Sequence, residues 1–170
     1  MGAASGLATA LEECLQDYAG GLQLHKEAQA MSRQLDRIGG ETGEGINTLM
    51  TTGNIATAHM RMDNYDASLA IFLDVLPKVK SKLGDDDPLA VAFTNNLATV
   101  YSCLGNNSAA RILREEALAR RRRALGNDDV LTMKAVASLG NVVFDIGDYY
   151  TAFALLEEAS ASYKRVLGPD

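Results

Sequence analysis

The groups in this sequence that could take part in acid–base or metal chemistry are few and poorly placed for it. His25 and His59 are the only histidines, and neither has a second ligand at the spacing of a metal site. Adjacent side chains on a helix diverge by about 100° and form no acid–base couple, which applies to all three glutamate pairs. The pairs are Glu12-Glu13, Glu115-Glu116 and Glu157-Glu158. Nothing marks a nucleophile turn, so we expect no enzyme, no metal site and no cofactor.

Two short runs share single features with ligand-binding loops. Gly40 and Gly45 have phosphate-loop spacing, but Ile46-Asn47 stands where that loop needs Lys and Ser or Thr. Asp85 to Asp87 lacks the glycine and the terminal glutamate of a calcium loop. We interpret the glycine run as a linker, and Asp85 to Asp87 and Asp128-Asp129 as helix caps.

Arg120 to Arg123 is the one dense run of charge. Four consecutive side chains on a helix spread around its circumference, and Glu116 precedes Arg120 at a spacing that suits a salt bridge. Cations are also favourable near a helix C-terminus. The run is therefore either a solvated helix end or a docking patch for an acidic partner.

The composition is that of one globular domain of 170 residues. A net charge of −6 argues against sequence-independent nucleic-acid binding and against docking on an anionic membrane. No stretch approaches the roughly 18 apolar residues of a membrane span, and the first residues lack the features of a signal peptide. Cys14 and Cys103 are interpreted as buried thiols of a reducing compartment. We therefore expect a cytoplasmic protein.

A step of 42 residues organises the chain. Leu83 to Leu89 recurs as Leu125 to Leu131, and the pattern begins again at Leu167. Apolar, small and turn positions keep the same step, as in Ile55, Leu97 and Leu139, in Ala56, Ala98 and Gly140, and in Asp63, Gly105 and Gly147. Such a period is typical of repeat proteins, in which each unit is buried against its neighbours.

Each period contains two amphipathic helical patterns separated by a turn. Phe93 to Leu104 and Ile112 to Leu125 carry apolar residues at steps of three and four, on either side of Gly105 to Asn107. Pro77 lies deep in the corresponding second helix of the preceding period, where we expect a kink and not an end.

Four helical hairpins in one continuous domain, about eight helices in all, are expected from this pattern. Residues 1–45 form a degenerate N-terminal hairpin, with helices over Leu7 to Ala19 and Leu22 to Ile38 broken at Gly20-Gly21, followed by the glycine-rich link. The other three hairpins span residues 46–84, 85–126 and 127–170.

The third of these units carries a family signature. Its matching residues are Leu139-Gly140, Val143, Gly147-Asp148-Tyr149, Ala152 and Ala159. Their spacing resembles the tetratricopeptide repeat, and the 42-residue period, with Asn95-Asn96-Leu97-Ala98, is similar to the longer repeats of kinesin light chains. The resemblance covers about Ile46 to Asp170. It implies an all-α, right-handed solenoid of antiparallel helix pairs that serves protein–protein interaction.

In this family the first helix of each pair lines a concave groove that holds a peptide or a partner helix. The resemblance places eight residues there: Asn54, Thr57, Arg61, Asn96, Thr99, Lys134, Asn141 and Phe144. The asparagines would bond the ligand backbone, or else a neighbouring repeat or water. One subclass clamps a C-terminal carboxylate with lysines, asparagines and an arginine. Only Asn96 and Lys134 match that set, so chaperone-tail binding is not expected.

The repeat pattern breaks off at Leu167 to Asp170, where a further unit would begin. Tyr163, Val166 and Leu167 should then leave an apolar strip exposed, which further repeats of a longer protein or a second copy of the chain would cover. Two functions remain open: a scaffold that holds a protein or peptide in the groove, or a structural subunit or fragment that binds through its end faces or convex surface.

Overall fold

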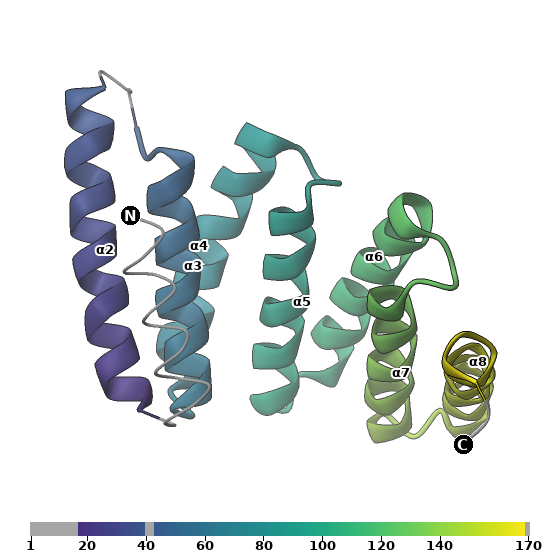
Figure 1. Ribbon diagram of the computed structural model, residues 1–170. Coiled ribbons are helices and arrows are strands. Elements are labelled where there is room, and N and C mark those ends of the chain that lie inside the picture. Colours follow the sequence, from purple (N-terminus) through teal and green to yellow (C-terminus); the bar gives the residue numbers. More distant parts are fainter. Residues whose placement is uncertain (1–16, 40–42, 169–170) are drawn as a thin grey trace. The chain divides into compact units, whose positions relative to one another are not determined.

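The computed structural model describes residues 17–39 and 43–168, which contain seven α-helices and no strand (Figure 1). The helices are α2 (Tyr18–Ile38), α3 (Ile46–Arg61), α4 (Tyr65–Leu83), α5 (Pro88–Cys103), α6 (Asn107–Leu125), α7 (Val130–Asp145) and α8 (Tyr149–Leu167). The all-α class is confirmed. Most of the helix predicted over Leu7 to Ala19 lies outside the described residues. None of the described helices is long and apolar enough to cross a membrane.

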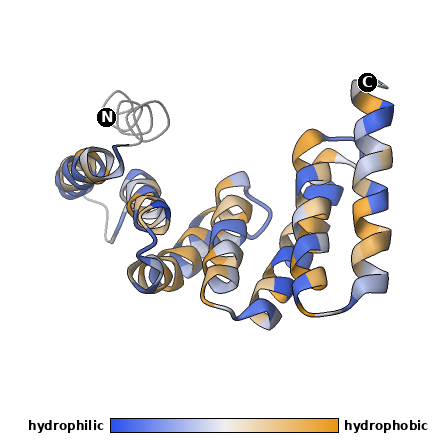
Figure 2. Ribbon diagram, turned by 90° about the horizontal axis from the view of Figure 1, so that it is seen from below, coloured by the Kyte–Doolittle hydropathy of each residue, from blue (hydrophilic) through white to orange (hydrophobic). Residues whose placement is uncertain are grey.

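The helix bounds repeat with the step found in the sequence. Three helices of 16 residues, α3, α5 and α7, begin at 46, 88 and 130, and three of 19 residues, α4, α6 and α8, begin at 65, 107 and 149. Hydrophobic and hydrophilic residues alternate along each helix (Figure 2), and the buried residues of α5 and α7, for example, are mainly apolar. Each period is therefore one pair of helices with an apolar interior.

Aspartates and asparagines begin most of these helices. The carboxylate of Asp87 accepts the N–H of Leu89 at 2.8 Å at the start of α5, and that of Asp129 accepts the N–H of Leu131 at 2.8 Å at the start of α7. The capping role predicted for the aspartate runs is thus confirmed at these two residues. Helix α3 is capped differently: Asp36 of the preceding helix accepts the N–H of Gly45 at 2.8 Å.

The turns inside the hairpins require a left-handed residue. Gly105 and Gly147 adopt φ values of 77° and 93°, and the equivalent position in the preceding repeat holds Asp63 at 58°. Glycine takes this conformation without steric cost, and aspartate is among the few other residues that tolerate it. One turn geometry therefore serves all three hairpins despite the difference in sequence.

The bounds of α2 and α4 test two local expectations. The break predicted at Gly20-Gly21 was wrong: α2 begins at Tyr18 and runs through both glycines. The cap lies upstream, because the Asp17 carboxylate accepts the N–H of Gly20 at 2.8 Å and so starts the helix before the glycines. At Pro77 the expectation that the helix continues was right, since α4 ends only at Leu83.

The chain divides into two compact units, Met1–Asp85 and Asp86–Asp170. In the first unit, α3 packs against α2 and α4. Its core contains Leu49, Ala56, Phe72, Val75 and Val79, none of them accessible to solvent. The hydroxyl of Ser68 donates to the Ala56 carbonyl at 2.8 Å, which requires α3 and α4 to approach closely.

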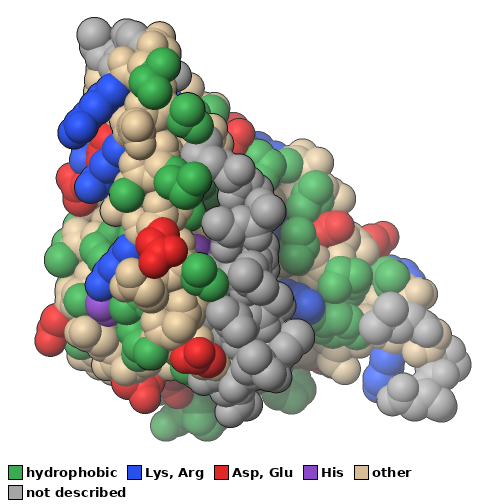
Figure 3. All heavy atoms as spheres, turned by 60° about the vertical axis from the view of Figure 1, so that its left-hand side comes forward, with side chains coloured by type: hydrophobic (Ala, Val, Ile, Leu, Met, Phe, Trp, Pro, Cys, Tyr) green, Lys and Arg blue, Asp and Glu red, His purple; other side chains and the backbone are tan. Residues whose placement is uncertain are grey.

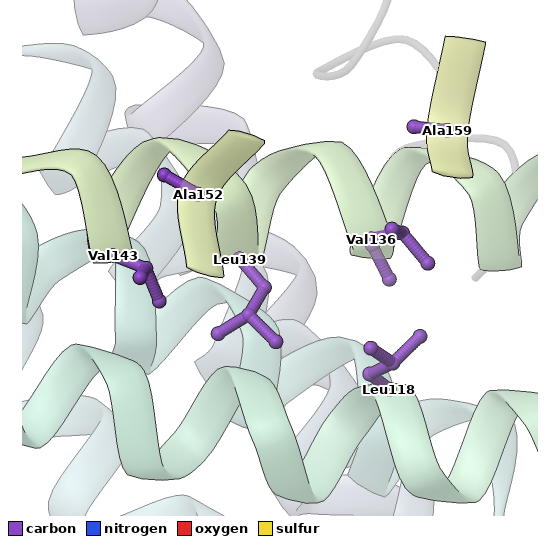
Figure 4. Packing of buried hydrophobic residues seen from close by; sticks show 7 residues of the cluster. Leu118, Val136, Leu139, Val143, Ala152 and Ala159 are labelled. Atoms are coloured by element: carbon purple, nitrogen blue, oxygen red, sulfur yellow. The ribbon is translucent and has the colours of Figure 1, made fainter. Parts of the chain in front are cut away.

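In the second unit, α6 packs against both α5 and α7, and α7 packs against α8. Its apolar cluster includes Leu118 of α6, Val136, Leu139 and Val143 of α7, and Ala152 and Ala159 of α8. Figure 4 shows the α7 side chains directed toward Leu118, with the alanines of α8 nearby. A Cβ atom added at Gly140 would lie 3.0 Å from the Leu156 side chain, so the small residue permits the close approach of α7 and α8.

Candidate binding surface

One face of α7 carries three polar residues in a row. Lys134, Ser138 and Asn141 follow at steps of four and three, which places them on the same side of the helix. Lys134 and Asn141 are exposed, and Ser138 is half-buried. Phe144 continues the row and is 55% exposed, with its ring in edge contact with Tyr149 at a centroid distance of 5.1 Å. This face includes three of the residues predicted to line the groove.

A similar row lies on α5. Asn96 and Thr99 are half-buried, and Cys103, one turn further on, is exposed. The expectation of a buried thiol was therefore wrong for Cys103, which is the last residue of α5. The Thr99 hydroxyl donates to the Asn95 carbonyl at 3.1 Å and is thereby fixed on the helix surface. Asn96 and Thr99 were predicted groove residues, so both first helices of this unit present a polar row.

Arg114 of α6 contacts both polar rows. Its Nη2 donates to the Thr99 hydroxyl on α5 at 3.3 Å, and its Nη1 donates to the Ser138 hydroxyl on α7. One guanidinium group therefore reaches both polar faces, and α5 and α7 turn these residues toward the same place. Arg114 itself is only 8% exposed.

The charge of Arg114 has no ion-pair partner among the described residues. Both of its bonded acceptors are neutral hydroxyls, and within the same part of the chain its Nε–H has no acceptor at all. Burial lowers the pKa of Arg114, and the nearby Cys103 opposes that shift. An arginine so placed keeps its charge at neutral pH, and a buried cation without a carboxylate is energetically unfavourable.

Sequence reasoning missed Arg114, although the repeat contained a signal. One step of 42 residues before and after it are Phe72 and Leu156. Phe72 is completely buried, so this position of the second helix belongs to the apolar interior of its unit. An arginine at a position that holds phenylalanine and leucine in the other periods marks a departure from simple core packing.

The remaining predicted groove residues, Asn54, Thr57 and Arg61, lie on one face of α3 in the first unit and are half-buried. A different face of α3 borders a hollow of about 530 Å³, which is lined mainly by polar side chains of α2, α3 and α4. Among them are Lys26, Arg33, Thr52, His59 and Asp74. In Figure 3, basic side chains follow one another along one edge of the face shown.

The arginine run of α6 is largely engaged within the chain. Arg120 contacts Asp86 at 2.7 Å and Glu116 at 3.1 Å, and Arg123 contacts Asp86 at 2.9 Å. Arg121 donates to the Leu131 carbonyl at 2.9 Å, and Arg122 pairs with Glu158. Arg120 and Arg123 lower the pKa of Asp86. The predicted salt bridge from Glu116 to Arg120 is present, whereas a role for the run in binding an acidic partner stays a prediction.

The pair formed by Asp86 repeats along the chain. Glu44 stands one step before Asp86 and contacts Lys78, one step before Arg120, at 3.0 Å. One step after Asp86, Asp128 pairs with Arg165. Each hairpin is thus closed by an ion pair between the acid that precedes its first helix and a cation of its second helix. We call these three contacts the hairpin clasps.

The predicted strip on α8 is partly exposed. Tyr163 is half-buried and Val166 is exposed, and the side chain of Leu167 lies outside the described part. More apolar surface is found earlier on the same helix, where Tyr150 is 88% and Phe153 is 68% exposed. Phe153 and Leu156 border an open hollow of about 400 Å³ on α8.

The two histidines are both shielded. His25 is buried and His59 is half-buried, and burial lowers the pKa of each, with Arg61 and Lys26 respectively adding to the shift. His59 lies beside Asn64, whose amide nitrogen is 3.5 Å from its Nδ1. In the part of the chain that is described, no three His, Cys, Asp or Glu side chains are grouped to hold a metal ion.

Comparison with known families decides the identity of the repeat. Two family models of the tetratricopeptide repeat match the chain, one over residues 47–123 and the other over residues 132–170. The chain belongs to the tetratricopeptide repeat family. The matched segments contain most of α5 to α7, with both polar rows and Arg114. Repeats of this family serve in general as scaffolds for protein–protein interaction. No curated protein sequence matches the chain.

Solved structures show the same fold. A protein of Podosopora anserina described as a kinesin light chain, with nearly identical TPR-like repeats, is 17% identical, with a TM-score of 0.82 over 96% of this chain and 74% of that one. A second crystal structure, of a variant of that protein, is 18% identical, with a TM-score of 0.82 over 97% of this chain and 75% of that one. BtubC (BKLC) from P. vanneervenii is 19% identical, with a TM-score of 0.82 over 95% of this chain and 61% of that one. At these identities the likeness concerns the fold of the tetratricopeptide repeats alone.

Proposed function

We infer that the chain binds an extended peptide or a helix of another protein on the polar faces of α5 and α7. The observation that carries this proposal is the contact of one guanidinium, that of Arg114, with both Thr99 and Ser138. It brings the two polar rows to one place, where exposed Lys134 and Asn141 stand beside half-buried hydroxyls. Tetratricopeptide repeats generally act as non-catalytic binding modules, and no catalytic step is part of the proposal.

The proposed contacts divide into two kinds. Asn96 and Asn141 would exchange hydrogen bonds with the backbone of an extended ligand, which any sequence offers. Lys134 and the exposed ring of Phe144 would contact side chains and so contribute selectivity. Asn54, Thr57 and Arg61 form a row on α3, and we propose them as a separate set of ligand contacts within the first unit. The division into hairpins 46–84, 85–126 and 127–170 within one continuous domain stays a prediction.

Selection of binders from a peptide display library, followed by fluorescence anisotropy on the full chain, tests the proposal. We expect the selected peptides to bind at least about tenfold more weakly to the double variant Lys134→Ala/Asn141→Ala, since two polar contacts to a ligand are lost. Lys164→Ala, a lysine-to-alanine change on exposed α8, is the control and should bind as the wild type does. Unchanged affinity in the double variant, with folded protein, would exclude the α5–α7 face.

A second candidate is a structural role through α8, favoured by the exposure of Tyr150 and Phe153. Aromatic rings at the surface are typical anchors of protein–protein contacts. If the same selected peptides, or self-association measured by light scattering, depend on Phe153→Ser and not on Lys134 and Asn141, the chain binds through this helix.

A further inference from the structure

The buried guanidinium of Arg114 is an electrostatic anomaly within its unit. At 8% exposure it has given up most of its hydration, yet its acceptors are the uncharged hydroxyls of Thr99 and Ser138. No carboxylate among the described residues pairs with it, although acidic side chains elsewhere in the unit pair with other arginines of the same helix. An unpaired buried cation is a strong site for an incoming anion.

The donor groups around Arg114 fit a carboxylate. Its Nη1 and Nη2 each carry a second N–H that the hydroxyls of Ser138 and Thr99 leave unfilled, and a flat, two-oxygen acceptor can use these two donors. The Ser138 hydroxyl accepts from Nη1 and keeps its own proton to donate. Thr99, in contrast, already donates to Asn95 and serves to hold the guanidinium in place. Lys134 adds a second positive charge one helical turn from Ser138.

Building on the peptide-binding function proposed above, we propose that Arg114, with Ser138, forms a carboxylate-binding site on the α5–α7 face and that the chain prefers ligands with a carboxylate at this point. The carboxylate belongs to an aspartate, a glutamate or the C-terminus of the bound segment. The site arises in one repeat only, because the equivalent positions of Arg114 hold Phe72 and Leu156. It therefore fixes the register of the ligand along the repeats.

The site differs from a surface arginine patch in its expected energetics. The arginines of the hairpin clasps, and Arg120, Arg122 and Arg123 of the α6 run, already contact acidic groups near the surface, so an anion gains little there. At Arg114 the guanidinium is held by two hydroxyls and largely shielded from water, so a charge-assisted pair is strengthened.

Oriented peptide pools test this inference on the full chain. One pool contains acetylated, amidated peptides of about ten residues that are random except for a central glutamate, and the matched pool has glutamine at that place. We expect the wild type to retain the glutamate pool about tenfold better, the effect of one charge-assisted contact. A third pool, with central glutamine and a free C-terminal carboxylate, tells whether the chain end supplies the anion.

Variants then assign the preference to Arg114. Arg114→Met should retain the glutamate and glutamine pools equally, while Arg114→Lys should keep part of the preference because it keeps the charge and loses the planar fork. Arg111→Met removes a half-exposed arginine of the same helix and should leave the ratio between the pools unchanged. Circular dichroism establishes that each variant remains helical.

Three outcomes would overturn the inference, and they are distinguishable. Equal retention of all pools by the wild type, with binding that still depends on Lys134 and Asn141, leaves the proposed peptide-binding function intact and removes the carboxylate site. A preference that survives Arg114→Met but is lost in Lys134→Gln assigns the anion to Lys134. If the wild type retains none of the pools, the peptide-binding function and the carboxylate site both fail.

Discussion

Replacing Arg114 by methionine should make the protein more stable, although it deletes two hydrogen bonds. The reason lies in where the side chain is: it is 8% exposed and has no carboxylate partner among the described residues. The equivalent position of the preceding repeat holds Phe72, which is completely buried, so an apolar side chain fits this place of a repeat. Methionine is flexible and fills irregular space well.

The magnitude follows from two opposing contributions. Removing the charge relieves a desolvation cost that amounts to several kcal/mol for a buried ion even after relaxation. The lost bonds cost less than their number suggests, because Thr99 keeps its bond to Asn95 and half-buried Ser138 regains a bond to water. We assign about 1–2 kcal/mol to that loss. Replacing a buried ion pair by well-packed apolar side chains of similar volume is often neutral or stabilises by about 1–4 kcal/mol, and we expect the lower half of that stabilising range here.

Urea unfolding of the full chain, followed by far-UV circular dichroism, measures this change. A gain of about 1–2 kcal/mol corresponds to a rise of about 2–8 °C in the melting temperature of a chain of this size. Arg111→Met is the matched control on α6: its side chain is half-exposed and pairs with Glu115 and Asp148, so its effect should stay within about 0.5 kcal/mol.

A loss of more than about 1 kcal/mol in Arg114→Met would refute this reasoning, because single core changes that break a structural network destabilise by such amounts. Arg114 would then be a strut that holds α5 and α7 together through Thr99 and Ser138. A double-mutant cycle with Ser138→Ala separates the two cases. A strut predicts a strong favourable coupling between the two residues, whereas an electrostatically strained site predicts little.

Three further predictions concern the turns, the histidines and the clasps. Gly105→Ala should destabilise by about 1–2 kcal/mol because φ is 77° there, and Gly105→Asp should cost less, as measured by urea midpoints. Burial lowers the pKa of His25 and His59, so the unfolded chain binds protons first as the pH falls below about 6.5. The free energy of unfolding should therefore be constant in this respect above that pH and decrease toward pH 5, and the His25→Gln variant should show a smaller decrease. Asp128→Arg should lower the melting temperature, Arg165→Glu should restore it in the double variant, and both effects should vanish in about 1 M salt.

The helices could be predicted well from the sequence because each repeat served as a reference for the others. A step of 42 residues placed the helix starts, and Asp87 and Asp129 capped them as expected. The N-terminal part lacks such a reference, and there the prediction failed: Gly20-Gly21 suggested a break, while the Asp17 cap starts a continuous helix. Helix propensity alone did not show whether the two glycines would break the helix or the Asp17 cap would start it ahead of them.

The partners of charged residues were harder to predict. Glu116 and Arg120 are four residues apart on one helix, and their pairing was foreseen. The hairpin clasps join residues 34 or 37 positions apart, which only the return of the second helix brings together. The arginine run was accordingly interpreted as a solvated helix end or a docking patch, whereas Arg120 and Arg123 close a hairpin on Asp86.

Comparison between the repeats also shows which positions are not explained by packing alone. Where three periods agree in character, as Ile55, Leu97 and Leu139 do, one apolar interior accounts for all of them. Arg114 breaks such agreement between Phe72 and Leu156, at a buried site where charge is unfavourable. Natural proteins accept such local conflicts mainly at functional positions. A buried arginine that joins the two polar faces of α5 and α7 is therefore better explained by a ligand than by the fold. A gain of stability in Arg114→Met would establish that the arginine is unfavourable for the fold, and a loss of carboxylate preference in the same variant would establish that it serves a ligand.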